Sequence, residues 1–395
     1  NDSLSTNTTA SNNTAVGNSA LFANTTGAQN VSVGANALDA NTTAANNTAL
    51  GYNALTLNTT GAQNVGLGAY ALQANTTAAY NVGIGYNTLG ATTTGQQNVA
   101  IGGEALDANT TGEYNVAIGT SALGANTTAS YNTAVGTSAL LANTTGAYNT
   151  ASGYGAMLEN TTGEGNVAIG MYALRRNTTA SGNIAIGWDT LDENTTGASN
   201  IAIGKQALTA NTTGAQNTAV GLNALVLNTE GSYNVSLGNY AGQTITTGDG
   251  CVSLGYNANP SSATVDNEFT LGSSSITSLR CNDTTISSLS DSRDKTDVID
   301  SPYGLGFINT VRPVQFKWES RDGNGKDGWT RVGFIAQELL VACDGNNAVL
   351  DLVSEENPEK LEAKYGNLLP IAIQAIQELS AQVDALTARI QTLEG

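Results

Sequence analysis

The first two-thirds of this chain consist of one repeat of fixed length. The motif Asn-x-small-apolar-Gly begins at Asn13 and recurs every 17 residues, without insertion or deletion, through Asn234, which gives fourteen copies. The register continues more weakly as far as Gly272. A constant period with one short extended segment per copy is typical of a solenoid or β-roll, in which each coil stacks on the next. The sequence therefore predicts a β-solenoid shaft over residues 1–272.

The columns of the repeat predict how each coil packs. The residue before the glycine is Val, Ile or Leu in thirteen of the fourteen copies, and the residue before that one is always Ala, Ser or Gly. Since neighbouring residues of a strand face opposite sides, we expect one side to bury the large aliphatic residue. We expect the small residues on the other side to lie against a second chain. The glycine never varies, which predicts a positive φ or a close backbone contact.

The remaining columns predict a second core residue and a turn. A leucine follows four residues after the glycine in most copies, with Met157 in one of them, and we expect it in the core of each coil. An Asn-Thr-Thr-Gly/Ala segment then closes the copy, and the side chains of Asn and Thr hydrogen-bond turn backbone. Stacked asparagines also form ladders between coils. We therefore expect these asparagines to stabilise the shaft rather than to carry chemistry.

Composition excludes several classes of function. The net charge of −18 argues against a nucleic-acid partner, because phosphate binding needs clustered Lys and Arg. The chain has no histidine, which excludes Ser-His-Asp and Cys-His nucleophiles and histidine metal ligands. Cys251, Cys281 and Cys343 have neither disulfide-framework nor zinc spacing. We therefore expect no metal and no cofactor.

The ends of the sequence carry further expectations. The chain has no run of 18 apolar residues and no visible signal peptide. Asn1 lies inside a repeat, so we expect the shaft to continue towards the N-terminus in the full protein.

Two sets of residues in the array are candidates for a glycan site. One column carries tyrosines that should stack as a ladder, which either stabilises the rod or binds sugar rings: Tyr80, Tyr114, Tyr131 and Tyr148. Five carboxylates could include a glycosidase pair, but they stand at columns where other copies carry neutral residues, so the alternative is that they are ordinary solvated surface residues. They are Glu104, Asp107, Glu113, Glu159 and Glu164.

The chain changes character after the last repeat. Residues 273–289 are rich in Ser, Thr and Ile and predict a narrow β neck. Residues 290–365 have the mixed pattern of a small α+β domain, in which Pro313 separates a short helix from an alternating strand. Residues 366–395 predict a coiled-coil helix, because apolar residues alternate steps of three and four from Ile376 onward, with Ile or Val at a and Leu at d.

Two resemblances follow from these motifs. Asn183-Ile184-Ala185-Ile186-Gly187 resembles the head repeats of trimeric autotransporter adhesins, which are trimers of β-rolls, and similar repeats occur in phage fibres.

Residues 290–395 resemble the peptidase S74 family, the intramolecular chaperone of endosialidases and tail fibres. The motifs in order are Ser-Asp-x-Arg-x-Lys from Ser290, Val-Arg-Pro-Val from Val311, Gly-Phe-Ile-Ala-Gln-Glu from Gly333 and Tyr-Gly-Asn-Leu from Tyr365. The resemblance implies a domain that trimerises, guides folding of the fibre ahead of it and then cuts the chain before the serine.

Mapped onto this sequence, the bond cut is Leu289–Ser290, with Ser290 as nucleophile and Lys295 as its base. A Ser-Lys pair is a known nucleophile system that needs no histidine. The lysine must be largely neutral, so its pKa near 10.4 must fall by about three units through burial or neighbouring cations. Candidate supporting residues are Arg293, Asp291 and Glu338. The aspartates oppose a neutral lysine, so we expect the site to act only when trimer packing changes its surroundings.

The sequence thus predicts a homotrimeric phage tail-fibre fragment. Its shaft would bind a host-surface glycan or outer-membrane component, and the missing N-terminal part would join other tail proteins. It would be assembled in the host cytoplasm and carried in the virion. The alternatives are a polysaccharide-degrading tailspike, with array carboxylates as catalysts, and a bacterial trimeric surface adhesin.

Overall fold

The computed structural model describes residues 2–276, 292–317, 329–355 and 361–394. The chain forms two units, Asn1–Ser273 and Ser274–Gly395, and each is treated by itself. The predicted neck, 273–289, lies almost entirely outside the described residues. Within those residues, no helix is long and apolar enough to cross a membrane.

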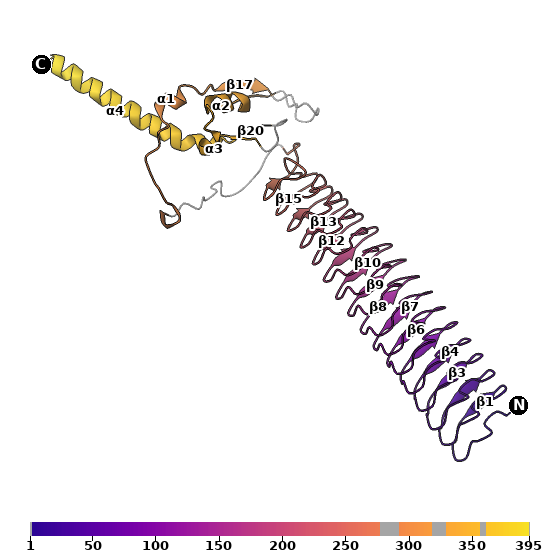
Figure 1. The fold of residues 1–395 in the computed structure, drawn as a ribbon. Coiled ribbons are helices and arrows are strands. Elements are labelled where there is room, and N and C mark those ends of the chain that lie inside the picture. The colour runs from indigo at the N-terminus through magenta and orange to yellow at the C-terminus, as the bar shows by residue number, and fades with distance from the viewer. Residues whose placement is uncertain (1, 277–291, 318–328, 356–360, 395) are drawn as a thin grey trace. The chain divides into compact units, whose positions relative to one another are not determined.

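The first unit is a parallel β-solenoid with one strand per coil (Figure 1), as the fixed period predicts. Each strand pairs with the next in the chain, so a residue faces the one 17 positions later, as Val99 faces Val116. The strands are β1 (Thr14–Val16), β2 (Val31–Val33), β3 (Thr48–Leu50), β4 (Val65–Leu67), β5 (Val82–Ile84), β6 (Val99–Ile101), β7 (Val116–Ile118), β8 (Thr133–Val135), β9 (Thr150–Ser152), β10 (Val167–Ile169), β11 (Ile184–Ile186), β12 (Ile201–Ile203), β13 (Thr218–Val220), β14 (Val235–Leu237), β15 (Val252–Leu254) and β16 (Phe269–Leu271).

The strands face the opposite way from the prediction. The small residue of strands β2 to β15 points into the coil and is buried, as Ala117 is, whereas the aliphatic residue before the glycine points outward, as Ile118 does with 38% of its surface exposed. The leucine four residues after the glycine fills the interior instead: a Cβ placed on Gly66 would lie 3.4 Å from the Leu55 side chain. A coil of 17 residues is therefore too narrow to bury a second large side chain opposite its leucine. Our placement of a second chain against the small residues was wrong.

The invariant glycine needs both properties predicted for it. Gly102 has φ +127°, and a Cβ there would lie 2.6 Å from the carbonyl carbon of Gly119 in the next coil. Other turns use left-handed residues that are not glycine, including the buried leucine itself, since Leu123 has φ 52°. This conformation is unfavourable for a side chain with a Cβ. Stacking of the coils must offset that cost.

Buried asparagines join successive coils, as predicted. The motif asparagine Asn115 donates its amide Nδ2–H to the Ala129 carbonyl at 2.9 Å, and its Oδ1 accepts the Asn132 backbone N–H at 3.0 Å. A second ladder runs through the turn asparagines, where Asn126 Nδ2 donates to Asn109 Oδ1 at 3.0 Å. These bonds satisfy polar groups that the coil interior takes out of water.

The second unit is a small α+β fold. Its elements are η1 (Ser292–Asp294), α1 (Leu305–Ile308), β17 (Val314–Lys317), β18 (Thr330–Gly333), α2 (Ala336–Ala342), α3 (Asn347–Leu350), β19 (Val353–Ser354), β20 (Glu362–Ala363), η2 (Tyr365–Asn367) and α4 (Leu368–Glu394). Strands β17 and β18 are antiparallel, as are β19 and β20. The core is formed by Leu339, Cys343, Leu350, Leu352, Val353, Leu368 and Ile371.

Helix α4 is buried only near its start. Leu368, Ile371 and Ala375 pack into the core of the unit. Within this chain the residues of the predicted heptad seam are exposed: Ile376, Leu379, Val383, Leu386, Ile390 and Leu393. The helix therefore carries an uncovered apolar stripe along most of its length.

Candidate functional site

The predicted cleavage site lies at the edge of the described chain. Leu289, Ser290 and Asp291 are outside the described residues. The structure resumes with the single turn η1, and the backbone N–H of Lys295 donates to the Ser292 carbonyl at 3.4 Å. Lys295 is exposed in this chain, as is Arg293. The pairing of Ser290 with Lys295 therefore stays a prediction.

Glu338 forms an ion pair with Arg312. The Arg312 Nε–H donates to Glu338 Oε2 at 2.9 Å, and its terminal nitrogen contacts the other carboxylate oxygen. Hydrogen bonding to Arg312 lowers the pKa of Glu338, and the same contact raises the pKa of Arg312. The pair lies in an open depression of ≈ 640 Å³, whose lining includes Thr310 and Val341. Arg312 and Glu338 come from two separate motifs of the sequence, which the fold brings together.

Tyr365, from a third motif, contacts the motif that begins at Gly333. The Tyr365 ring lies edge-on to Phe334, with centroids 5.4 Å apart, and its hydroxyl lies 3.3 Å from the Phe334 backbone nitrogen. A Cβ on Gly333 would lie 2.8 Å from that hydroxyl and 3.0 Å from the Phe316 ring. Glycine at 333 is therefore explained by the close approach of this tyrosine.

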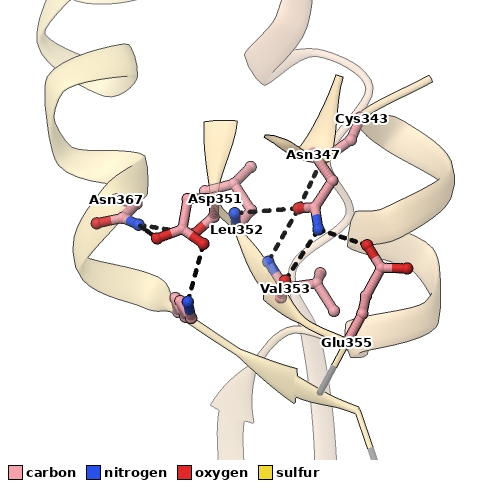
Figure 2. A network of polar contacts seen from close by, with 8 residues as sticks. Cys343, Asn347, Asp351, Leu352, Val353, Glu355 and Asn367 are labelled. Atoms are coloured by element: carbon pink, nitrogen blue, oxygen red, sulfur yellow. Dashed lines mark hydrogen bonds and ion pairs between the residues drawn. The ribbon is translucent and has the colours of Figure 1, made fainter. Parts of the chain in front are cut away.

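Asn347 organises the turn before β19 (Figure 2). Its Oδ1 accepts the backbone N–H groups of Leu352 and Val353 at 3.2 and 3.1 Å. Its Nδ2 donates to the Val353 carbonyl at 2.9 Å and to Glu355 Oε1 at 2.7 Å. One side chain thus replaces the backbone bonds that the turn lacks, a structural role that our sequence analysis missed.

Asp351 fixes the entry to α4. Its carboxylate accepts from Lys364 Nζ at 2.8 Å, and Asn367 Nδ2 donates to its backbone carbonyl at 2.6 Å (Figure 2). Asp351 has φ 45°, a left-handed conformation that Asp tolerates better than most residues. Glu378 of α4 in turn accepts the backbone N–H of Leu305 at the start of α1, at 2.8 Å. The first half of α4 is therefore held by polar as well as apolar contacts.

Comparison with known families bears on this unit. Residues 290–348 match the model of the Peptidase_S74 family, described as the chaperone of endosialidase. The chain carries a Peptidase_S74 domain. The match begins at Ser290 and ends within α3, so α4 lies beyond it. A Peptidase_S74 domain preceded by a 17-residue β-solenoid is consistent with an endosialidase-type or tail-fibre protein. No curated protein and no solved structure matches this chain.

The tyrosine ladder of the array has the predicted stacking. Tyr114 and Tyr131 have centroids 5.0 Å apart with planes 3° from parallel, and Tyr131 and Tyr148 are 5.2 Å apart at 2°. Tyr80 stands in the same column two coils before Tyr114, and all four side chains are about half exposed. A glycan role for this ladder stays a prediction.

A second group of aromatics was missed by the sequence analysis. It lies at the residue after the glycine and the residue after that, where rings of adjacent coils meet edge-on. The pairs are Tyr52–Tyr70, Tyr70–Tyr86, Tyr154–Tyr172 and Tyr240–Tyr256. The sequence pattern that could have predicted these pairs is a tyrosine directly after the repeat glycine, which occurs at positions 52, 86, 154 and 256.

The candidate carboxylates yield one testable electrostatic effect. Burial raises the pKa of Asp107 above its ordinary 3.8, and Glu104 raises it further. A carboxyl whose pKa is higher in the folded chain destabilises the fold as pH rises through that range. We expect Asp107→Asn to raise the melting temperature at pH 7 by up to about 2 °C, with no gain below pH 3.8. Thermal melts followed by circular dichroism measure this, with Glu113→Gln as control. An equal gain at both pH values contradicts it.

Proposed function

We propose that this chain is part of a homotrimeric phage tail fibre, in which the solenoid is the shaft and the Peptidase_S74 domain is an assembly chaperone that removes itself. The family match supports this, because it begins at the proposed nucleophile, Ser290. The exposed heptad stripe of α4 supports association of chains, because a coiled coil would cover it. The fibre would attach to a bacterial surface and join other tail proteins through its N-terminal part.

The proposed cut needs only groups of the chain and one water molecule. Ser290 Oγ attacks the Leu289 carbonyl carbon while the neutral amine of Lys295 takes the hydroxyl proton. The C–N bond then breaks, the Ser290 nitrogen leaves with the proton returned by Lys295, and an ester links Leu289 to Ser290 Oγ. Water hydrolyses the ester, which leaves a carboxylate at Leu289 and a free amine at Ser290. Lys295 is exposed in the single chain, so we expect this step to await the contacts made on assembly.

The test is a comparison of the full chain with Ser290→Ala and Lys295→Ala by denaturing gel and mass spectrometry. We expect the wild type to give fragments 1–289 and 290–395, and both variants to stay intact. The control variant Ser292→Ala, changed two residues away, should be cleaved before Ser290 like the wild type. Cleavage of the Ser290→Ala variant would refute self-processing, and so would a wild type that assembles without being cleaved. The chaperone role is tested separately, by whether the chains assemble.

The attachment role rests on the stacked tyrosines at 114, 131 and 148, since sugar rings pack on aromatic faces. We propose that the shaft binds a surface glycan or an outer-membrane component there. Binding of the full chain to host cells, weakened at least about tenfold by replacing these tyrosines with serine, would support this. Release of reducing sugars from host polysaccharide would instead favour a degrading tailspike.

A further inference from the structure

The outward side of every strand forms one continuous surface along the solenoid. Positions one and three after the motif asparagine point outward, and we call these two columns the aliphatic face; Val116 and Ile118 are examples. The second column is Val, Ile or Leu in fifteen of its sixteen coils, and Ser152 is the exception. Its residues that are more than a third exposed include Val16, Leu50, Ile101, Ile118, Val135, Ile169, Ile203, Leu237 and Leu271.

One further column borders the aliphatic face. It is the residue after the glycine, and it holds the exposed side chains of Tyr154 and Trp188. Residues 1–273 contain seventeen charged residues, and within these three columns Lys205 is the one that is charged. Its Nζ lies 4.1 Å from the centre of the Trp188 ring, so its charge is held over an aromatic face. Depletion of charge and enrichment in aromatics mark the core of a protein interface.

The surface is large enough for a stable contact between chains. Sixteen strands at about 4.8 Å spacing extend for about 70 Å, and the three columns span about 13 Å at about 3.3 Å per residue. The resulting area of about 900 Å² is close to the roughly 800 Å² that each partner contributes to a stable interface.

We propose that the aliphatic face packs against the same face of further copies of this chain, aligned in parallel. The face repeats once per coil over its whole length, and a copy of the chain presents apolar ridges at the same spacing. The second unit independently exposes the α4 stripe, which copies of the chain would also cover. This inference rests in part on the proposed function, because it identifies the surface by which the shaft of the fibre holds its chains together.

The repeat also gives the chaperone a physical task. Sliding one copy past another by a single coil restores most of the aliphatic contacts, because the second column is Val, Ile or Leu in fifteen of its sixteen coils. A strongly repetitive interface therefore defines its register poorly. The register must be set by a part of the chain that does not repeat, and the Peptidase_S74 unit is such a part.

The test places charge on the face in the full chain. We expect the wild type to be multimeric by native mass spectrometry and analytical ultracentrifugation. Ile118→Glu with Ile169→Glu should weaken association at least about 100-fold, because carboxylates would be buried unpaired. The matched control is Thr111→Glu with Thr162→Glu, which adds the same charges to the two coils directly before them, at exposed positions outside the three columns. That variant should assemble like the wild type.

A second variant covers the case in which the double glutamate chain does not fold. Ile118→Cys should give chain-to-chain disulfides on oxidation, and Thr111→Cys should give none. A monomeric wild type, or a double glutamate variant that assembles normally, would overturn the inference. The two proposals can be told apart with Leu379→Glu and Leu386→Glu in α4. If this pair prevents assembly while the double glutamate variant of the aliphatic face assembles, the chaperone proposal is supported and the aliphatic-face proposal is refuted.

Discussion

Replacing Gly102 with alanine should destabilise the solenoid by about 3 kcal/mol or more. Its φ of +127° lies in a region open almost only to glycine, which accounts for about 1–3 kcal/mol. The new Cβ would also lie 2.6 Å from the Gly119 carbonyl carbon and 3.0 Å from the Thr120 nitrogen. Both contacts are with backbone of the next coil, so no side chain can move away to relieve them. Urea unfolding followed by circular dichroism should show a much lower midpoint.

The adjacent glycine is a matched control. A Cβ on Gly103 meets nothing within 4 Å, and the same column holds Ala35 and Ala69 in other coils. Gly103→Ala should therefore change stability by no more than about 0.5 kcal/mol. If the two alanine variants unfold at the same urea midpoint, close stacking of the coils is not the reason that this column of the repeat holds only glycine.

Asn115→Asp should cost about 3–5 kcal/mol at pH 7, because it buries a charge with no cation beside it. Asn115 Nδ2 donates to the Ala129 carbonyl at 2.9 Å and to Asn98 Oδ1 at 3.2 Å. In the variant a carboxylate oxygen would face those two acceptors. Cys251 stands in this column near the end of the array with its Sγ 3.1 Å from the Val265 carbonyl, so a donor is kept there as well.

The effect of Asn115→Asp should depend on pH in a defined direction. Burial raises the pKa of the new carboxyl above its unfolded value of about 3.9, so its proton is bound more strongly in the folded chain. The loss of stability should be smallest below pH 4 and should grow as pH rises through the folded pKa. Unfolding at pH 3.5 and pH 7 measures the difference. Gln96→Glu, an exposed change at a column where the next coil has Glu113, should show little effect, and equal losses for both variants would refute the buried ladder.

The C-terminal unit was predicted in outline, and its polar connections were not. Pro313 marked the change from helix to strand, and the structure has α1 before it and β17 after it. The motifs that carry the family resemblance contain Arg312 and Glu338, but nothing in their spacing, 26 residues apart, says that the side chains touch. That contact follows from the antiparallel pairing of β18 with β17, which places Gly333 opposite Val314 and so brings the start of α2 back towards Arg312. The sequence did not predict the role of Asn347 in the turn before β19, because an asparagine in a short polar stretch is usually a solvent-exposed surface residue.

The sequence alone determined the solenoid, its 17-residue period, the need for glycine at one column and the presence of the chaperone domain. Each of these follows from local chemistry or from a pattern of residue types along the chain. Only the tertiary structure decided which side of the strand faces inward. Alternation of small and aliphatic residues shows that the two sides differ, yet it does not say which one is buried. The left-handed leucine decides it, because it fills the narrow coil opposite the small residues and leaves the aliphatic side outside, where copies of the chain can cover it.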